Sequence, residues 1–255
     1  MKLLELRQAS ISIGDKMVCD GFDLQVKSGE VWGVLGGNGV GKTTLLNTVA
    51  GLHDLDRGEI KILDKPLAAW KRKELARNLG ILFQDSSDTF PSSVYETAMS
   101  GRYPYLSFLQ MESAADHEVV QQALRDFSLE NMQNRQVDTL SGGERRRLAL
   151  ATLIIQNPRL WLLDEPANHL DLHQQISLLD LLLARVRQGQ GGALMVLHDV
   201  NLLRRYCSHA MLMINEEKIV CGATTEVLND SNLSELYQHP IRRIQEKGVE
   251  YFFAE

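Results

Sequence analysis

The chain has 255 residues, of which 44% are hydrophobic and 24% charged, an ordinary composition for a globular protein with a substantial core. Its formal net charge of −6 argues against a nucleic-acid partner, because nucleic-acid-binding proteins normally carry a basic surplus. No apolar run approaches the ~18–20 residues that a spanning helix requires, and charges interrupt the first seven residues where a signal peptide would be apolar. We therefore expect a protein that is neither exported nor membrane-integral, with three reduced cysteines (Cys19, Cys207 and Cys221).

The first part of the chain predicts strands that lead into a helix. Alternating apolar residues at 11–13 and 22–26 indicate half-buried strands, and the apolar run 31–35 indicates a buried one. A helix is expected from about Lys42 to Ala50, because Gly51 then ends the pattern.

A glycine-rich run joins the buried strand to this helix and matches G-x-x-x-x-G-K-[ST]. Backbone N–H groups of such a loop wrap phosphate oxygens, and the helix N-terminus adds the positive end of its dipole. We expect the Lys42 ammonium to reach the β- and γ-phosphates of ATP, and the Thr43 hydroxyl to bind Mg²⁺. The predicted nucleotide-binding residues are Gly36, Gly37, Asn38, Gly39, Val40, Gly41, Lys42, Thr43 and Thr44.

The middle of the chain predicts helices and the following part alternates helix and strand. Helical periodicity at Val119, Ala123, Leu124 and Phe127 indicates a helical insertion over roughly 85–140. Helical stretches at 145–156 and 170–187 precede apolar strands at 160–163 and 193–197, respectively. This alternation favours an α/β domain with a parallel sheet. The residues after 229 give no clear pattern.

Polar side chains follow both of these later strands. The strand at 160–163 ends in Asp164 and Glu165, and the strand at 193–197 is followed by His198. Since the carboxyl ends of parallel strands form the ligand-binding edge, we expect Asp164 to hold Mg²⁺ and Glu165 to act as general base on the attacking water. His198 is expected to contact the γ-phosphate. His169 and His173 have the spacing of a zinc face but lack the glutamate of a zinc protease, which disfavours a metal site there.

The run 140–144, Leu-Ser-Gly-Gly-Glu, resembles the LSGGQ signature of ABC-transporter ATPases. The resemblance covers residues 3–230 and implies that Gln84 is the Q-loop glutamine, that 168–171 form the D-loop, and that His198 is the switch histidine. The implied fold is a P-loop NTPase (RecA-like) α/β core with a β-rich N-terminal subdomain and an inserted helical subdomain. Within a single domain 1–255, the core would be 1–84 and 151–230, the helical subdomain 85–150 and a C-terminal tail 231–255.

The family implies a head-to-tail pair of identical chains that sandwich two ATP molecules. Each ATP would lie between the phosphate loop of one copy and Ser141, Gly142 and Gly143 of the other, at what we expect to be a second helix N-terminus. By the same resemblance Gln84 assists catalysis, binds the metal and relays nucleotide state to the helical insertion. Asp171 of the D-loop is implied as a further nucleotide-site residue.

Within the family, residues 95–105 and 205–207 look like the corresponding segments of importers of iron chelates, haem and cobalamin. That resemblance implies integral membrane permease partners, an indirect link to a substrate-binding protein, and a peripheral position on the cytoplasmic face of the inner membrane. The competing hypothesis is a soluble ABC ATPase of an assembly pathway such as iron–sulfur cluster biogenesis.

Three positions depart from the usual motifs of the family. Gly37 stands where proline is usual, and Glu144 ends the signature in place of glutamine. Ile13 occupies the position, 23 residues before the first loop glycine, of the aromatic residue that normally stacks on adenine. The sequence therefore predicts intact phosphate contacts but leaves the base specificity open.

Overall fold

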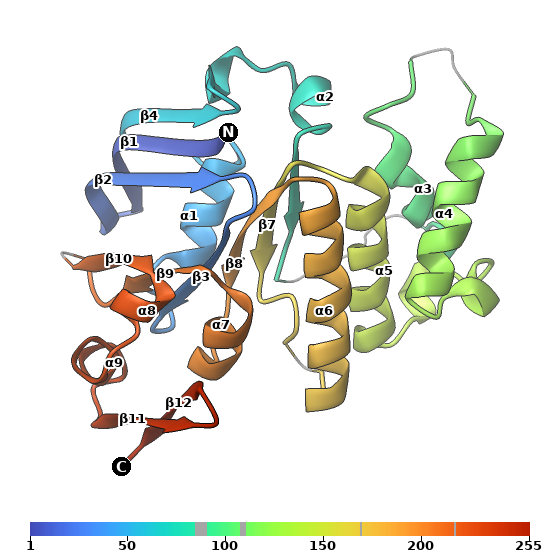
Figure 1. Ribbon diagram of the computed structural model, residues 1–255. Coiled ribbons are helices and arrows are strands. Elements are labelled where there is room, and N and C mark those ends of the chain that lie inside the picture. Colours follow the sequence, from blue (N-terminus) through green and yellow to red (C-terminus); the bar gives the residue numbers. More distant parts are fainter. Residues whose placement is uncertain (85–90, 108–110, 169, 217) are drawn as a thin grey trace.

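The computed structural model describes residues 1–84, 91–107, 111–168, 170–216 and 218–255 (Figure 1). Its helices are α1 (Lys42–Val49), α2 (Arg72–Leu75), α3 (Val94–Met99), α4 (Ala114–Asp126), α5 (Gly142–Gln156), α6 (Leu172–Gln188), α7 (Val200–Tyr206), α8 (Thr224–Val227) and α9 (Asp230–Tyr237). Its strands are β1 (Lys2–Ile13), β2 (Lys16–Lys27), β3 (Val31–Gly36), β4 (Arg57–Ile62), β5 (Lys65–Pro66), β6 (Leu79–Leu82), β7 (Leu160–Asp164), β8 (Gly192–Val196), β9 (His209–Met213), β10 (Ile219–Ala223), β11 (Ile241–Glu246) and β12 (Val249–Ala254).

A six-stranded sheet of order β10-β9-β3-β8-β7-β6 forms the centre of the molecule. From β9 to β6 each neighbouring pair is parallel, and β10 adds an antiparallel edge. Successive side chains of β7 enter opposite layers: Leu160 and Leu162 pack on one face, Trp161 and Leu163 on the other. Both faces are thus covered, which explains why these strands are continuous apolar runs. The predicted parallel α/β core is confirmed.

The N-terminal residues form a second sheet, antiparallel, of order β2-β1-β4-β5. Helix α1 lies between the two sheets and buries Leu45, Leu46 and Val49 against both of them. The strands expected at 11–13 and 22–26 belong to β1 and β2, and the β-rich N-terminal subdomain is confirmed. Ile11 is fully buried, whereas the Ile13 side chain lies 52% exposed at the end of β1.

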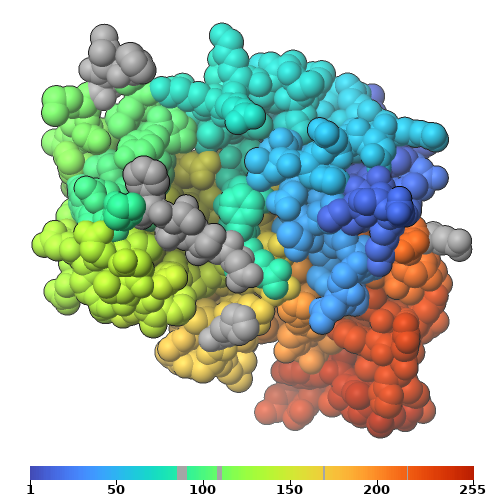
Figure 2. All heavy atoms as spheres, turned by 180° about the vertical axis from the view of Figure 1, so that it is seen from behind, coloured from blue at the N-terminus to red at the C-terminus, as the bar shows by residue number. Residues whose placement is uncertain are grey.

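Helices α3, α4, α5, α6 and α7 cover the other face of the central sheet (Figure 1). Val120, Ala123 and Leu124 of α4 share one apolar cluster with Trp161 and other residues of the sheet, so the helical insertion does not have a core of its own. The boundary expected at 150 falls inside α5, because that helix runs on to Gln156. Seen from behind, the green helical region and the blue N-terminal region occupy opposite sides of the molecule (Figure 2).

The residues after 229, for which the sequence showed no pattern, form regular structure. They contain α9, capped by the Asn229 side chain, and an antiparallel hairpin of β11 and β12. Phe252 anchors the hairpin in the core, with only 4% of its surface exposed. The expected tail 231–255 is therefore a folded module packed beside α7. Within the part of the chain that the structure describes, no helix is both long and apolar enough to cross a membrane.

Candidate nucleotide-hydrolysis site

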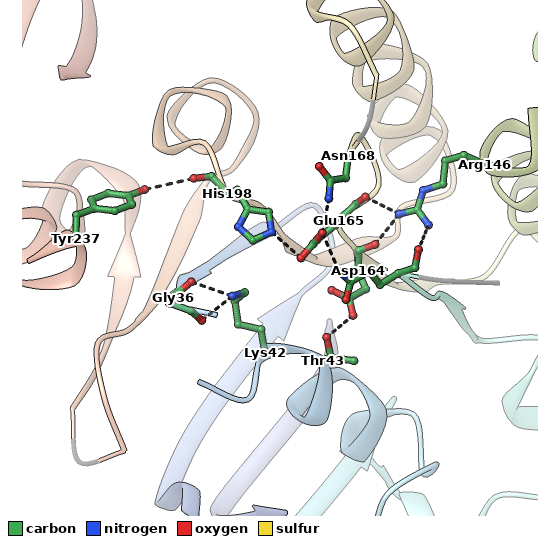
Figure 3. Close-up of polar contacts among 11 residues, drawn as sticks. Gly36, Lys42, Thr43, Arg146, Asp164, Glu165, Asn168, His198 and Tyr237 are labelled. Atoms are coloured by element: carbon green, nitrogen blue, oxygen red, sulfur yellow. Dashed lines mark hydrogen bonds and ion pairs between the residues drawn. The ribbon is translucent and has the colours of Figure 1, made fainter. Parts of the chain in front are cut away.

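Four neighbouring strands bring the predicted site residues to one edge of the central sheet. Gly36 ends β3, Asp164 ends β7, and His198 and Gln84 follow β8 and β6. Because the order of these strands is β3-β8-β7-β6 and all run parallel, their carboxyl ends meet at the same edge (Figure 3). The sheet topology therefore assembles residues that are far apart in the sequence.

The phosphate loop depends on glycine at two of its positions. Gly39 and Gly41 have φ values of 73° and 109°, a region that residues with a side chain rarely adopt. A Cβ atom at Gly41 would also lie 2.4 Å from a methyl group of Val18. Gly41 is the N-cap of α1 and gives that helix no side-chain cap. The first amides of α1 therefore face the loop, as a phosphate-binding site requires.

Lys42 lies inside this loop with 7% of its surface exposed. Its ammonium donates to the carbonyl oxygens of Gly36 and Gly37, at 2.8 and 2.9 Å (Figure 3). Burial lowers the pKa of the ammonium group, and the carboxylates of Glu165 and Asp164 partly offset this effect. The structure thus places a cation at the loop, opposite the two acidic groups.

Thr43 and Asp164 form a pair that fits a magnesium ion. The Thr43 hydroxyl donates to Asp164 Oδ2 at 2.7 Å, and Oδ1 of the same carboxylate is buried without a hydrogen-bond partner among the described residues. Burial raises the pKa of Asp164, which shows that the charged carboxylate is poorly solvated where it stands. A hydroxyl and a carboxylate with one oxygen free are oxygen donors of the kind that Mg²⁺ takes in proteins.

Glu165 is held by side chains from three different segments. One carboxylate oxygen contacts His198 Nε2 at 2.6 Å; the other accepts from the amides of Asn168 at 2.7 Å and Gln84 at 3.3 Å (Figure 3). Only 7% of Glu165 is exposed, and its φ is 49°. Such strained backbone at a non-glycine residue is typical of functional sites. The arrangement orients a carboxylate beside the Thr43–Asp164 pair, where it could accept a proton from water.

The signature residues lie elsewhere in the chain. Ser141 is the N-cap of α5 and forms a capping box with Glu144: the Ser141 hydroxyl accepts from the Glu144 N–H, and the Glu144 carboxylate from the Ser141 N–H. The helix N-terminus expected at Ser141 is therefore confirmed. Glu144, which stands where glutamine is usual in the family, helps to cap this helix. Helix α5 packs in the apolar cluster on one face of the central sheet, whereas α1 packs in the cluster on the other face (Figure 1).

Asp171 caps α6 by accepting a hydrogen bond from the Gln174 N–H at 2.9 Å. His169 of the expected D-loop lies outside the described residues, and so does the predicted relation between His169 and His173. Over the described ranges no three His, Cys, Asp or Glu residues gather as a metal site.

Two contributors to the site escaped the sequence analysis. Asn168, predicted only as part of the D-loop, donates directly to Glu165. Arg146 contacts the backbone on both sides of the site (Figure 3). The sequence signal for Arg146 is the run of three arginines that begins at Arg145, directly after the signature.

Comparisons with known proteins identify the family of the chain. The ABC transporter family pattern matches residues 19–168. The chain is 35% identical over 231 residues to the achromobactin transport ATP-binding protein CbrD of Dickeya dadantii (strain 3937), covering 91% of this chain and 86% of that protein. It is also 35% identical over 242 residues to the hemin import ATP-binding protein HmuV of Shewanella denitrificans (strain OS217), covering 93% and 94%.

A solved structure described as a metal-chelate type ABC transporter in an inward-facing conformation superposes with a TM-score of 0.83 at 26% identity, over 100% of this chain and 97% of that one. The match therefore includes the C-terminal module as well as the nucleotide core. The chain belongs to the ABC transporter family, as an ATP-binding subunit that hydrolyses ATP.

Proposed function

We propose that two copies of this chain form a head-to-tail dimer in which each ATP lies between the phosphate loop of one copy and the signature of the other. Two features support this arrangement. The N-terminus of α5 presents Gly142 and Gly143, neither of which has an atom within 4 Å of where a Cβ would stand. The same helix packs on the opposite face of the central sheet from α1, which follows the phosphate loop (Figure 1). A second copy supplies the missing half of each site, and Asp171 of the expected D-loop is a further nucleotide-site residue in this proposal.

Hydrolysis in this proposal depends on Glu165 as general base. The observation that carries it is the set of three side chains that orient the Glu165 carboxylate beside the Thr43–Asp164 pair. Mg²⁺, held by Thr43 and Asp164 with Gln84 nearby, would supply charge stabilisation to the phosphates. Lys42 binds the β- and γ-phosphates, and His198 contacts the γ-phosphate while it holds Glu165.

The cargo that we infer is a metal chelate, haem or cobalamin, taken up through separate permease subunits in the inner membrane. The names of the relatives, which refer to achromobactin and hemin, support import of this class. The chain would bind the permeases from the cytoplasmic face as a peripheral subunit, and a substrate-binding protein would deliver the cargo outside. The relatives give no support to the alternative of iron–sulfur cluster assembly. Co-purification of the tagged chain with a multi-span membrane protein is the expected result; a solely soluble assembly partner would favour the alternative.

Glu165→Gln is the test of the catalytic assignment. The amide keeps the shape of the side chain but cannot accept a proton, so turnover should fall by ~10²–10⁴-fold while MgATP still binds. Steady-state ATPase activity and the dissociation constant of a fluorescent ATP analogue measure the two quantities separately. Turnover close to that of the wild type would show that another group is the base.

A further inference from the structure

Arg146, the fifth residue of α5, reaches the site through its guanidinium group. Its nitrogens donate to five main-chain carbonyl oxygens, at distances from 2.5 to 3.4 Å. These carbonyls belong to two segments. Phe83 and Gln84 follow β6, and Asp164 ends β7 with Glu165 and Pro166 directly after it. One side chain of the signature helix thus joins the segments that carry the glutamine and the two carboxylates (Figure 3).

The Glu165 turn needs such support. A non-glycine residue at φ 49° is in a sparsely populated conformation, which persists only where the surroundings impose it. Arg146 fixes the carbonyl of that residue and the carbonyls on both sides of it, so the peptide planes around Glu165 cannot rotate without breaking hydrogen bonds. A planar guanidinium has several N–H donors and can bond to several carbonyl oxygens around it, which a lysine ammonium does less well.

We propose that Arg146 is a positioning residue that holds the Glu165 turn and the Gln84 segment in the geometry for hydrolysis, and links both to the signature helix. The inference rests on the proposed role of Glu165. It goes further, because the position of the Glu165 carboxylate then depends on the position of α5. Movement of the helical region relative to the sheet then changes the active site through this one guanidinium.

The test compares Arg146→Ala with Arg125→Ala, whose arginine lies exposed on α4 and donates from its guanidinium to Gln122 of the same helix. Misplacement of a reacting group by about 1 Å can cost ~10²-fold, so kcat of Arg146→Ala should fall by roughly 10- to 100-fold. The KM for MgATP should stay within about twofold, because the phosphate loop is untouched. Arg125→Ala should match the wild type in both constants.

Chemical rescue separates positioning from a general loss of structure. Millimolar guanidinium chloride should restore part of the lost kcat in Arg146→Ala, whereas NaCl at the same ionic strength should not, and neither should raise the activity of Arg125→Ala. If Arg146→Ala fails to fold, Arg146→Lys replaces it in the test. Lysine keeps the positive charge but lacks the planar guanidinium, so kcat should still fall about fivefold or more.

The inference would be overturned if Arg146→Ala or Arg146→Lys kept the kcat of the wild type. It would also be overturned if Arg146→Ala had a raised KM and a lower stability and guanidinium restored no activity. Glu165→Gln, measured in parallel, tells the two failures apart. If Glu165→Gln is inactive and Arg146→Lys is fully active, only the role of Arg146 is wrong. If Glu165→Gln is active, the assigned base is wrong, and the effect of Arg146 needs another cause.

Discussion

Glycines 37 and 41 of the phosphate loop face different steric limits. Gly41 combines a φ of 109° with a Cβ position 2.4 Å from Val18, whereas a Cβ at Gly37 would meet nothing within 4 Å. We predict that Gly41→Ala distorts the start of α1 and weakens MgATP binding by more than tenfold, or over ~1.4 kcal/mol. Gly37→Ala is the matched control and should weaken binding much less. Isothermal titration with MgATP measures both; equal effects would mean that loop strain does not govern the affinity.

Ile13 is the residue whose role the sequence left open. It lies half-exposed at the end of β1 and pairs with Lys16, whose ammonium donates to the Gly39 carbonyl at 3.0 Å. The end of β1 that carries Ile13 is thus linked to the phosphate loop through Lys16, and a role of Ile13 at the base stays a prediction. Aromatic stacking on a base contributes ~1–3 kcal/mol, so Ile13→Tyr should tighten ATP binding roughly tenfold.

The wild type should hydrolyse GTP at a rate comparable to ATP. Aromatic stacking is tolerant of base identity, so the absence of an aromatic ring at position 13 should weaken the binding of both nucleotides alike. Titration of a fluorescent ATP analogue against wild type and Ile13→Tyr decides the matter. Equal dissociation constants would show that a different side chain, such as an aromatic residue of the second copy, covers the base.

The C-terminal module is tied to the segment that follows the switch histidine. The Asn201 side chain makes two hydrogen bonds with the backbone of Phe252, at 2.8 and 3.0 Å, and the Tyr237 hydroxyl donates to the His198 carbonyl at 3.4 Å. Burial and the charge of Asp199 raise the pKa of Tyr237 to about 12, so this phenol stays a donor at neutral pH. Residues 237–254 therefore brace the loop that carries His198.

Asn201→Ala should destabilise the protein by about 1–3 kcal/mol, because it leaves backbone groups of the buried Phe252 unpaired. The exposed Asn134→Ala is the control and should change the free energy of unfolding by less than about 0.5 kcal/mol. Urea unfolding monitored by circular dichroism measures both. Similar curves for the two variants would mean that the hairpin packs without help from α7.

Local patterns predicted most elements that carry the site. The apolar runs at 31–35 and 160–163 and the phosphate loop needed only neighbouring residues to be recognised, and β3, β7 and α1 lie where they were expected. The hairpin β11–β12 could not be predicted in this way, because most of its side chains are exposed and the buried Phe252 has its partners on α7. Arg146 was missed for a similar reason: the five acceptors that it has among the described residues are main-chain atoms, which no side-chain pattern encodes.

At the scale of the whole molecule, the two apolar clusters on either side of the central sheet fix the site edge and the signature helix as parts of one body. The phosphate loop belongs to the cluster that contains α1, and Ser141 begins a helix of the other cluster. A single chain therefore carries its phosphate loop and its signature on different clusters, and in the proposed dimer each ATP joins the phosphate loop of one copy to the signature of the other.

The mass of Glu165→Gln in solution tests this central claim most directly. Because this variant should bind MgATP without hydrolysing it, light scattering after size exclusion should give twice the 28.7 kDa monomer mass with MgATP and the monomer mass without it. Adding Ser141→Arg should return the protein to a monomer that still binds MgATP through Lys42. A monomer at saturating MgATP, or a dimer that Ser141→Arg leaves intact, would contradict a nucleotide site shared between two chains.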